Sequence, residues 1–217
     1  MRSIDVHYTP LDVGLNNGRD YIQGSQIIAC LVERLDAAER ASWRLKRASF
    51  HKITDRIVCA ALSSEVPDLN SHIGKVSFCN GHEQMHFLLT EANDRAPERK
   101  VEANRIEVIG LTAHGQSRYK YEGRSDFWSL LDVIIQACKR HVIESVFGSD
   151  RFMFTGLGFN SLPLAPDESW ATGHLKIEQL RRLDRNGTAQ TMNRFVIVAG
   201  DNATCEGVFG FAFRYES

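Results

Sequence analysis

The sequence predicts an α+β protein made of two similar units, each an antiparallel sheet wrapped around one long central helix. Three observations support this prediction. A Gly-Arg turn occurs twice, at residues 18–21 and 123–127; a long apolar helix pattern follows each turn; and a run of strand-like segments follows each helix. One complete unit is therefore expected in each half of the chain.

The two helices are predicted from the spacing of their apolar residues. Residues 22–35 and 127–146 repeat apolar side chains every three or four positions, which is typical of a helix that buries one broad face. These side chains are Ile27, Ile28, Leu31, Val32 and Leu35 in the first segment, and Leu130, Leu131, Ile134, Ile135, Cys138, Val142 and Val146 in the second.

The strands are predicted in matching order behind each helix. Residues 43–51 correspond to 152–160, so the two halves should superpose with Phe50 on Phe159. The further strands are expected at residues 57–62, 75–78 and 85–89 in the first half and 170–180, 190–198 and 205–213 in the second. Residues 184–187 contain an Asn-Gly pair and residues 200–202 a second turn signal, as expected between antiparallel strands.

Residues 91–100 are rich in charge and contain Pro97, so they are predicted to link the two units. The expected domains are residues 1–96 and residues 97–217. Two unrelated α+β domains remain the alternative.

The charge balance argues against a polyanionic partner. Twenty-six basic and 27 acidic residues leave a formal net charge of −1, so neither nucleic acid nor an anionic membrane is expected to bind. The N-terminus has no apolar run of the signal-peptide kind, which predicts a cytoplasmic protein. The cysteines lack CxxC spacing and are expected to be reduced and mostly buried: Cys30, Cys59, Cys79, Cys138 and Cys205.

His82 and His86 have the i, i+4 spacing that binds zinc on a helix. They fall, however, at an expected strand, where residues four apart stand too far from each other to chelate one ion easily. No metal site is predicted.

The second half resembles known families. Residues 126–137 are similar to the central helix of hotdog-fold β-hydroxyacyl-ACP dehydratases, in which an acidic residue is followed four positions later by Gln. With residues 123–126 before it and 147–153 after it, this stretch also resembles the A-factor biosynthesis hotdog family, itself a tandem of hotdog repeats. The first half shares only the pattern.

The resemblance implies a double hotdog whose two sheets join edge to edge, with thioester sites at the interface of the halves. The implied substrate is an acyl thioester on acyl carrier protein or CoA. Its 4'-phosphopantetheine arm belongs to the substrate, and no other cofactor is expected. A monomer or a homodimer is the expected assembly.

The resemblance places the catalytic carboxylate on Asp132 and its partner amide on Gln136. The dehydratases also use a loop histidine about fourteen residues before the helix acid, but Arg118 stands there in this chain. The first-half counterpart of Asp132 is Gln26, and fourteen residues before it stands Asp12. An acid hydrogen-bonded to its own helix is the structural alternative for Asp132.

Further candidates lie in the loops and at the helix start. Asn16 and Asn17 resemble the Asn-Asn loop of hotdog thioesterases, where a nearby Asp activates water, a role that Asp12 could fill; a plain turn is the alternative. His114 lies in a loop before Gly115 and could bring an imidazole to a site, or be solvated. The substrate-binding candidates are Asn16, Gln26, Phe127, Trp128 and His114.

Three functions stay open. The first is dehydration of 3-hydroxyacyl thioesters in fatty-acid-like or secondary metabolism. The second is acyl transfer or condensation of the A-factor type, or thioester hydrolysis. The third is a non-catalytic module for acyl-carrier binding or dimerisation. The missing histidine favours the second and third, whereas Asp132 and Gln136 favour the first two.

Overall fold

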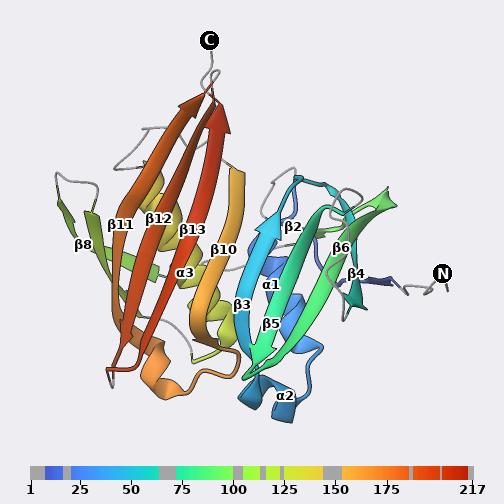
Figure 1. Ribbon diagram of the computed structural model, residues 1–217, viewed down its shortest axis with the longest axis horizontal. Helices are drawn as coiled ribbons and strands as arrows, with labels where there is room; N and C mark the ends of the chain where they lie inside the picture. Colours follow the sequence, from blue (N-terminus) through green and yellow to red (C-terminus); the bar gives the residue numbers. More distant parts are fainter. Residues whose placement is uncertain are drawn as a thin grey trace. The chain divides into compact units, whose positions relative to one another are not determined.

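The computed structural model describes residues 8–16, 21–63, 72–99, 105–112, 116–122, 125–143, 153–185, 188–200 and 202–214. The chain divides into two compact units, Met1–Glu102 and Ala103–Ser217, named unit 1 and unit 2 below. In the described part of the chain no helix is long and apolar enough to cross a bilayer. Both units consist mainly of antiparallel sheet with few helices (Figure 1).

The sheet of unit 1 has the strand order β1-β4-β6-β5-β3, and all neighbours are antiparallel. The strands are β1 (Thr9–Pro10), β3 (Arg44–Phe50), β4 (Arg56–Ser63), β5 (Gly74–Asn80) and β6 (Glu83–Arg95). A separate parallel pair joins β2 (Leu15–Asn16) to β7 (Glu98–Arg99). The helices are α1 (Gly24–Glu33) and α2 (Ala37–Ser42).

Helix α1 lies against the inner face of this sheet. A Cβ atom on Gly24, the first residue of α1, would lie 2.6 Å from the Phe50 ring of β3, so helix and strand are in close contact there. The helix is shorter than the predicted 22–35. Asp36 begins a second helix instead: its side chain accepts a hydrogen bond from Glu39 N, and the Glu39 carboxylate accepts one from Asp36 N.

The sheet of unit 2 has the strand order β10-β13-β12-β11-β9-β8, again antiparallel throughout. Its elements are β8 (Arg105–Thr112), β9 (Gln116–Glu122), α3 (Phe127–Val142), β10 (Met153–Pro163), the 3-10 turn η3 (Glu168–Ala171), β11 (Thr172–Arg185), β12 (Thr188–Ala199) and β13 (Thr204–Arg214). In Figure 1, α3 passes behind β11, β12 and β13.

Helix α3 is fixed at both ends by favourable electrostatics. At its start, the Asp126 side chain accepts hydrogen bonds from Ser129 N at 2.8 Å and from Ser129 Oγ at 3.0 Å. Its last turn carries Lys139 and Arg140, whose positive charge suits the helix dipole. Residues 144–146 of the predicted helix lie outside the described residues.

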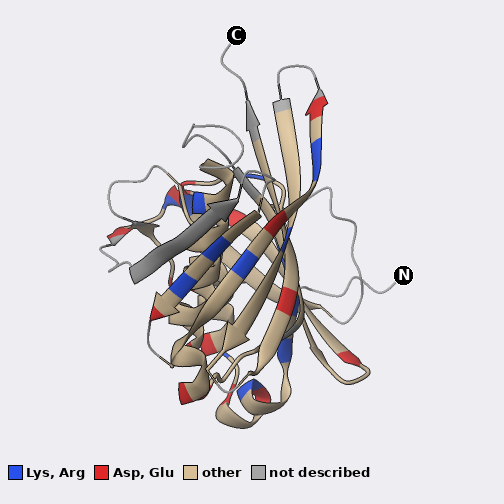
Figure 2. Ribbon diagram, turned by 90° about the vertical axis from the view of Figure 1, so that its left-hand side faces the viewer, with Lys and Arg blue, Asp and Glu red and all other residues tan. Residues whose placement is uncertain are grey.

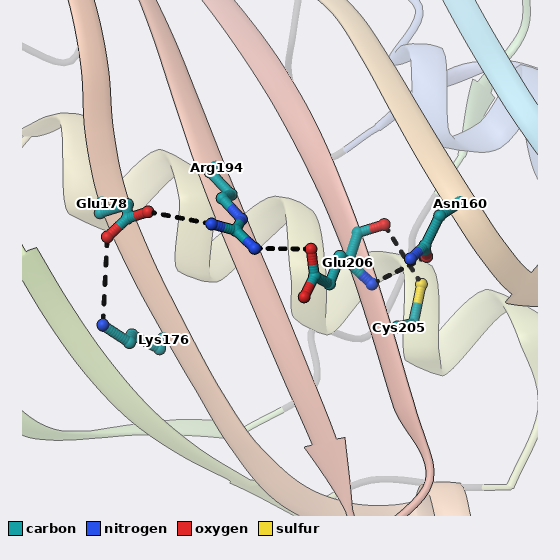
Figure 3. Close-up of polar contacts among 6 residues, drawn as sticks. All are labelled: Asn160, Lys176, Glu178, Arg194, Cys205 and Glu206. Carbon is teal, nitrogen blue, oxygen red and sulfur yellow. Dashed lines mark hydrogen bonds and ion pairs between the residues drawn. The ribbon is translucent and has the colours of Figure 1, made fainter.

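The outer face of this sheet, opposite α3, carries a chain of polar contacts across four strands (Figure 3). Arg194 of β12 pairs with Glu178 of β11 at 3.6 Å and with Glu206 of β13 at 2.7 Å. Lys176 approaches Glu178 at 3.9 Å, and Glu206 N donates to Asn160 Oδ1 of β10 at 2.9 Å. In the view of Figure 2, bands of positive and negative residues are interspersed along the strands.

Three predictions of secondary structure need correction. Residues 91–95, predicted as linker, continue β6, because β4 is long enough to pair with them as far as Arg56 opposite Arg95. The strand predicted from residue 170 begins at Thr172 instead, because Asp167 caps a 3-10 turn that contains Trp170. A short helix at Ala37–Ser42 was not predicted at all.

The predicted turns of unit 2 agree with the register. Arg185 pairs with Thr188, which makes β11 and β12 a hairpin, although Asn186 and Gly187 themselves lie outside the described residues. At the next turn Asn202 has a φ of 62°, and its N–H donates to Ala199 O at 3.0 Å. All five cysteines are free thiols, as predicted.

The Phe50 and Phe159 pair has a common environment in the two units. Phe50 of β3 lies opposite Gly74 of β5, and Phe159 of β10 lies opposite Gly207 of β13. In both sheets a buried phenylalanine ring therefore faces a glycine on the neighbouring strand. Superposition of the halves on these two residues stays a prediction.

Candidate functional site

Asp132 and Gln136 lie one turn apart on α3 and contact each other. Gln136 Nε2 donates a hydrogen bond to Asp132 Oδ2 at 2.6 Å. Both side chains are half-buried, whereas Leu131, Ile134 and Cys138 on the adjoining face of the helix are buried. The carboxylate is therefore held in one orientation at the margin of the core, and not within it.

The aromatic candidates at the start of α3 have different surroundings. Phe127, the first residue of the helix, is buried in the core. Trp128 is half-buried and precedes Asp132 by one helical turn, so the two residues share one stripe of the helix. Trp128 can thus provide an apolar wall beside the carboxylate.

Arg118 faces away from α3. In β9 the alternate residues Ser117, Tyr119 and Tyr121 are buried, and Ser117 Oγ contacts His141 Nδ1 of α3 at 2.7 Å, which identifies the inner face of the strand. Arg118 lies between them in sequence and is exposed, so it points to the outer face. The position that holds a histidine in the dehydratases therefore supplies no side chain to the α3 side of this sheet.

In unit 1, Gln26, the predicted counterpart of Asp132, is tied to a loop. Gly14 N donates to Gln26 Oε1 at 3.4 Å, and Gln26 is only 8% exposed. Cys30, one turn further along α1, forms a hydrogen bond with the backbone of Asp12. Burial raises the pKa of the Cys30 thiol, and this hydrogen bond opposes the rise. Gln26 and Cys30 together hold the backbone of residues 12–14 against α1.

The remaining loop candidates are less well placed by the structure. Asp12 has an exposed side chain next to the tethered backbone. Asn16 ends β2, but its side chain is not described; Asn17 and His114 lie outside the described residues. Among the candidates, the structure brings together Asp132 with Gln136, and Gln26 with the loop that carries Asp12. His86 is buried in β6, and His82 is exposed in the preceding turn.

Sequence reasoning missed a set of buried polar side chains on the inner face of unit 2. Besides the Ser117 and His141 pair, Asn193 Nδ2 donates to Thr191 Oγ1 at 3.1 Å, and neither Tyr121 Oη nor Asn193 Oδ1 has a hydrogen-bond partner among the described residues. Burial raises the pKa of Tyr121 to about 12, so its hydroxyl stays protonated at neutral pH and can donate a hydrogen bond. The alternation of Ser117, Tyr119 and Tyr121 was the available signal, since it has the period of a strand.

The sequence matches no protein-family model and no curated protein. Its structure does match solved structures. A conserved protein of unknown function with a hotdog fold, from Alicyclobacillus acidocaldarius, superposes with a TM-score of 0.55 at 7% identity, over 91% of this chain and 89% of that one. The chain has the hotdog fold.

Two further structures carry the same fold. The tesB protein of Mycobacterium avium subsp. paratuberculosis matches with a TM-score of 0.56 at 10% identity, over 93% of this chain and 90% of that one. An acyl-CoA thioesterase II from Mycobacterium marinum matches with a TM-score of 0.52 at 9% identity, over 89% and 90%. The predicted hotdog resemblance is thus confirmed at the level of the fold.

Proposed function

We propose that this chain is a double hotdog protein that hydrolyses acyl thioesters in the cytoplasm, with Asp132 as the general base. The observation that carries the proposal is the hydrogen bond from Gln136 Nε2 to Asp132 Oδ2 at 2.6 Å. Hydrolysis requires one group that accepts a proton from water as the water attacks the thioester carbonyl. A carboxylate held in a fixed orientation at the edge of an apolar core suits that role.

The proposed reaction has two steps. Asp132 accepts a proton from water while the water oxygen bonds to the carbonyl carbon, giving a tetrahedral intermediate. The carbon–sulfur bond then breaks, and the proton passes from Asp132 to the departing sulfur, so the products are a carboxylic acid and a thiol. Gln136 orients the carboxylate, and Trp128 contacts the acyl chain.

Hydrolysis is favoured over dehydration by the position of Arg118. Dehydration of a 3-hydroxyacyl thioester needs a base for the α-proton and an acid for the departing hydroxyl. Arg118 occupies the dehydratase histidine position and points to the outer face of β9. The function named for the M. marinum structure, an acyl-CoA thioesterase, agrees with this choice.

The implied substrate is an acyl chain on the 4'-phosphopantetheine arm of CoA or of acyl carrier protein, which would then be the partner. Dehydration remains the second candidate, because the acid and the Gln of the dehydratase-like helix do form the contact that their four-residue spacing allows.

The test is release of free thiol from a panel of acyl-CoA thioesters, measured with a thiol reagent. We expect Asp132→Asn to lower the rate by about 10²- to 10⁴-fold, because it removes the proton acceptor and keeps the shape of the side chain. The matched control is Asp184→Asn on β11, which removes an exposed carboxylate that pairs with Arg182, and should keep full activity.

The other outcomes identify the alternatives. Equal activity of wild type and Asp132→Asn would show that Asp132 is structural and move the test to Asp12. Formation of enoyl thioester from 3-hydroxyacyl-CoA without thiol release would support dehydration. Binding without turnover of hydroxyacyl, enoyl and ketoacyl thioesters would indicate a binding module.

A further inference from the structure

The outer face of the unit 1 sheet gathers basic side chains from adjacent strands. Arg47 of β3 lies opposite Ser77 of β5, which in turn lies opposite His86 of β6. Lys75, two residues before Ser77, points to the same face. The register shift between Leu45 and Arg47 places two consecutive residues, Lys46 and Arg47, on the outside of the sheet, and both are exposed.

A buried hydrogen bond forms the floor of this cluster. His86 Nδ1 and Ser77 Oγ are 3.0 Å apart, and each residue is 7% exposed. The face is the outer one, because the neighbouring residues Val76 and Phe87 are buried on the other side, the side to which Phe50 and α1 belong. A polar floor with cationic side chains around it is therefore built into the middle of the sheet.

The positive charges of the cluster are not compensated by the strands that carry them. The sequences of β3, β4 and β5 contain no Asp or Glu. On β6, Glu83 falls at an inward position of the strand's alternation, Glu91 is already paired with Lys52, and Asp94 lies at the far end of the strand, eight residues from His86. Among the described residues no ion pair involves Lys46, Arg47 or Lys75.

The basic groups also act on one another. Burial, followed by the charges of Lys75 and Lys46, lowers the pKa of His86. Burial, followed by the charge of Arg47, lowers the pKa of Lys75. Like charges that depress one another in this way attract an anion, which relieves their repulsion.

The centre of the outer face of unit 2, on β11, β12 and β13, shows the opposite arrangement. There Arg194 lies between Glu178 and Glu206, and Lys176 approaches Glu178, so basic and acidic side chains alternate across the strands (Figure 3). At the centre of that face the basic residues are thus paired with carboxylates, whereas no such pair occurs among the described residues of the unit 1 cluster.

We propose that Lys46, Arg47, Lys75, Ser77 and His86 form a binding site for a phosphate monoester on the outer face of unit 1. The planar guanidinium of Arg47 can donate two parallel hydrogen bonds to phosphate oxygens, the lysines add point charges, and Ser77 and His86 add donors from the floor. Binding of a dianion would draw a proton onto His86. The proposal does not depend on thioester hydrolysis.

Calorimetric titration at constant ionic strength tests the site, with inorganic phosphate and adenosine monophosphate as probes and adenosine as the uncharged control. We expect saturable binding of one phosphate group per chain. Arg47→Gln and Lys75→Gln should each weaken it by about tenfold, the loss expected for a charge-assisted hydrogen bond. The matched control is Arg181→Gln, an exposed arginine on β11 of unit 2, which should bind as the wild type does.

A second readout separates a site from loose attraction. The pKa of His86, followed by NMR of its ring proton, should rise on addition of phosphate in the wild type, and rise less in Lys75→Gln. Binding of both probes with equal affinity supports a site for the phosphate alone, whereas tighter binding of the nucleotide supports a nucleotide phosphate. Absence of saturation, or equal weakening in Arg181→Gln, overturns the proposal.

Discussion

The two units use polar side chains near the starts of their helices in different ways. In unit 1, Gln26 is buried, and its side-chain oxygen accepts a hydrogen bond from the backbone of Gly14. Its amide therefore holds the loop of residues 12–14. In unit 2, Asp132 is half-buried, and its contact is with Gln136 on the same helix. The helix of unit 1 thus fixes a loop, whereas the helix of unit 2 keeps a carboxylate near solvent, where the proposed base lies.

Truncation of a buried leucine on each helix is expected to give the largest loss of stability. It also tests whether the two helices are equally well packed. Leu31 of α1 and Leu131 of α3 are both 0% exposed. Replacing either by Ala should lower the free energy of unfolding by about 2–5 kcal/mol, because the change removes buried methyl groups and leaves a cavity. Urea unfolding followed by circular dichroism measures both. A loss below about 1 kcal/mol in one of them would show that its unit is loosely packed there.

The paired glycines provide a sharper comparison. A Cβ on Gly207 would clash with Gly158 O and with the Phe195 ring, whereas a Cβ on Gly74 would lie 2.6 Å from Ser49 O and otherwise make milder contacts. Both Gly→Ala variants should be destabilised, by about 1–3 kcal/mol, with Gly207→Ala the worse of the two. Thermal unfolding ranks them, and the reverse order would show that the Phe195 ring yields more readily than the atoms around Gly74.

Helix α3 has a side-chain N-cap and helix α1 has none, and single mutations can remove the first cap or add the second. Asp126 caps α3 through Ser129 N, whereas Gln23 precedes α1 without a side-chain cap. Asp126→Ala should therefore cost about 1 kcal/mol, and Gln23→Asp should stabilise unit 1 by up to about the same amount. Chemical unfolding of both variants measures this, with Asp184→Asn as a surface control. No gain from Gln23→Asp would mean that the backbone at residue 23 does not admit a cap.

The smallest expected effect concerns pH and is specific to unit 1. Because burial and the charges of Lys75 and Lys46 lower the pKa of His86, the unfolded chain binds a proton at this site more readily than the folded one. The stability from neutral His86 is thus present above the ordinary histidine pKa of 6.5 and declines as pH falls below it toward the lowered folded value. His86→Gln should flatten the dependence of melting temperature on pH in this window. An unchanged slope would assign the effect to other groups.

Much of the fold could be predicted because its signals are periodic. The apolar stripes of α1 and α3, the paired strands and the turn at residues 200–202 all depend on local spacing. The features that the sequence did not predict depend on contacts between side chains and on strand pairing. The charges of residues 91–95 suggested a linker, but in the structure they continue the solvent-exposed end of β6, where charged side chains are well accommodated. The helix at Ala37–Ser42 was missed because it depends on the capping box formed by Asp36 and Glu39.

The candidate site was predictable only in part. The four-residue spacing of Asp132 and Gln136 allows one hydrogen bond on a helix, and the structure contains it. The outward direction of Arg118 could not be known until Ser117 was placed opposite His141, because alternation along a strand does not say which set faces the helix. The link between Gln26 and Gly14 joins residues whose approach depends on the path of the loop.

The buried free thiols give each unit an internal reporter of its own opening. Cys59 is buried in the unit 1 sheet, and Cys138 is 0% exposed on α3 of unit 2, where burial raises its pKa well above the ordinary thiol value. A thiol reagent can reach such a group only when the surrounding structure separates transiently, so its modification rate under native conditions follows local opening and not chemical reactivity. Timed labelling with mass spectrometry would thus give separate opening free energies for the two units, without any added probe.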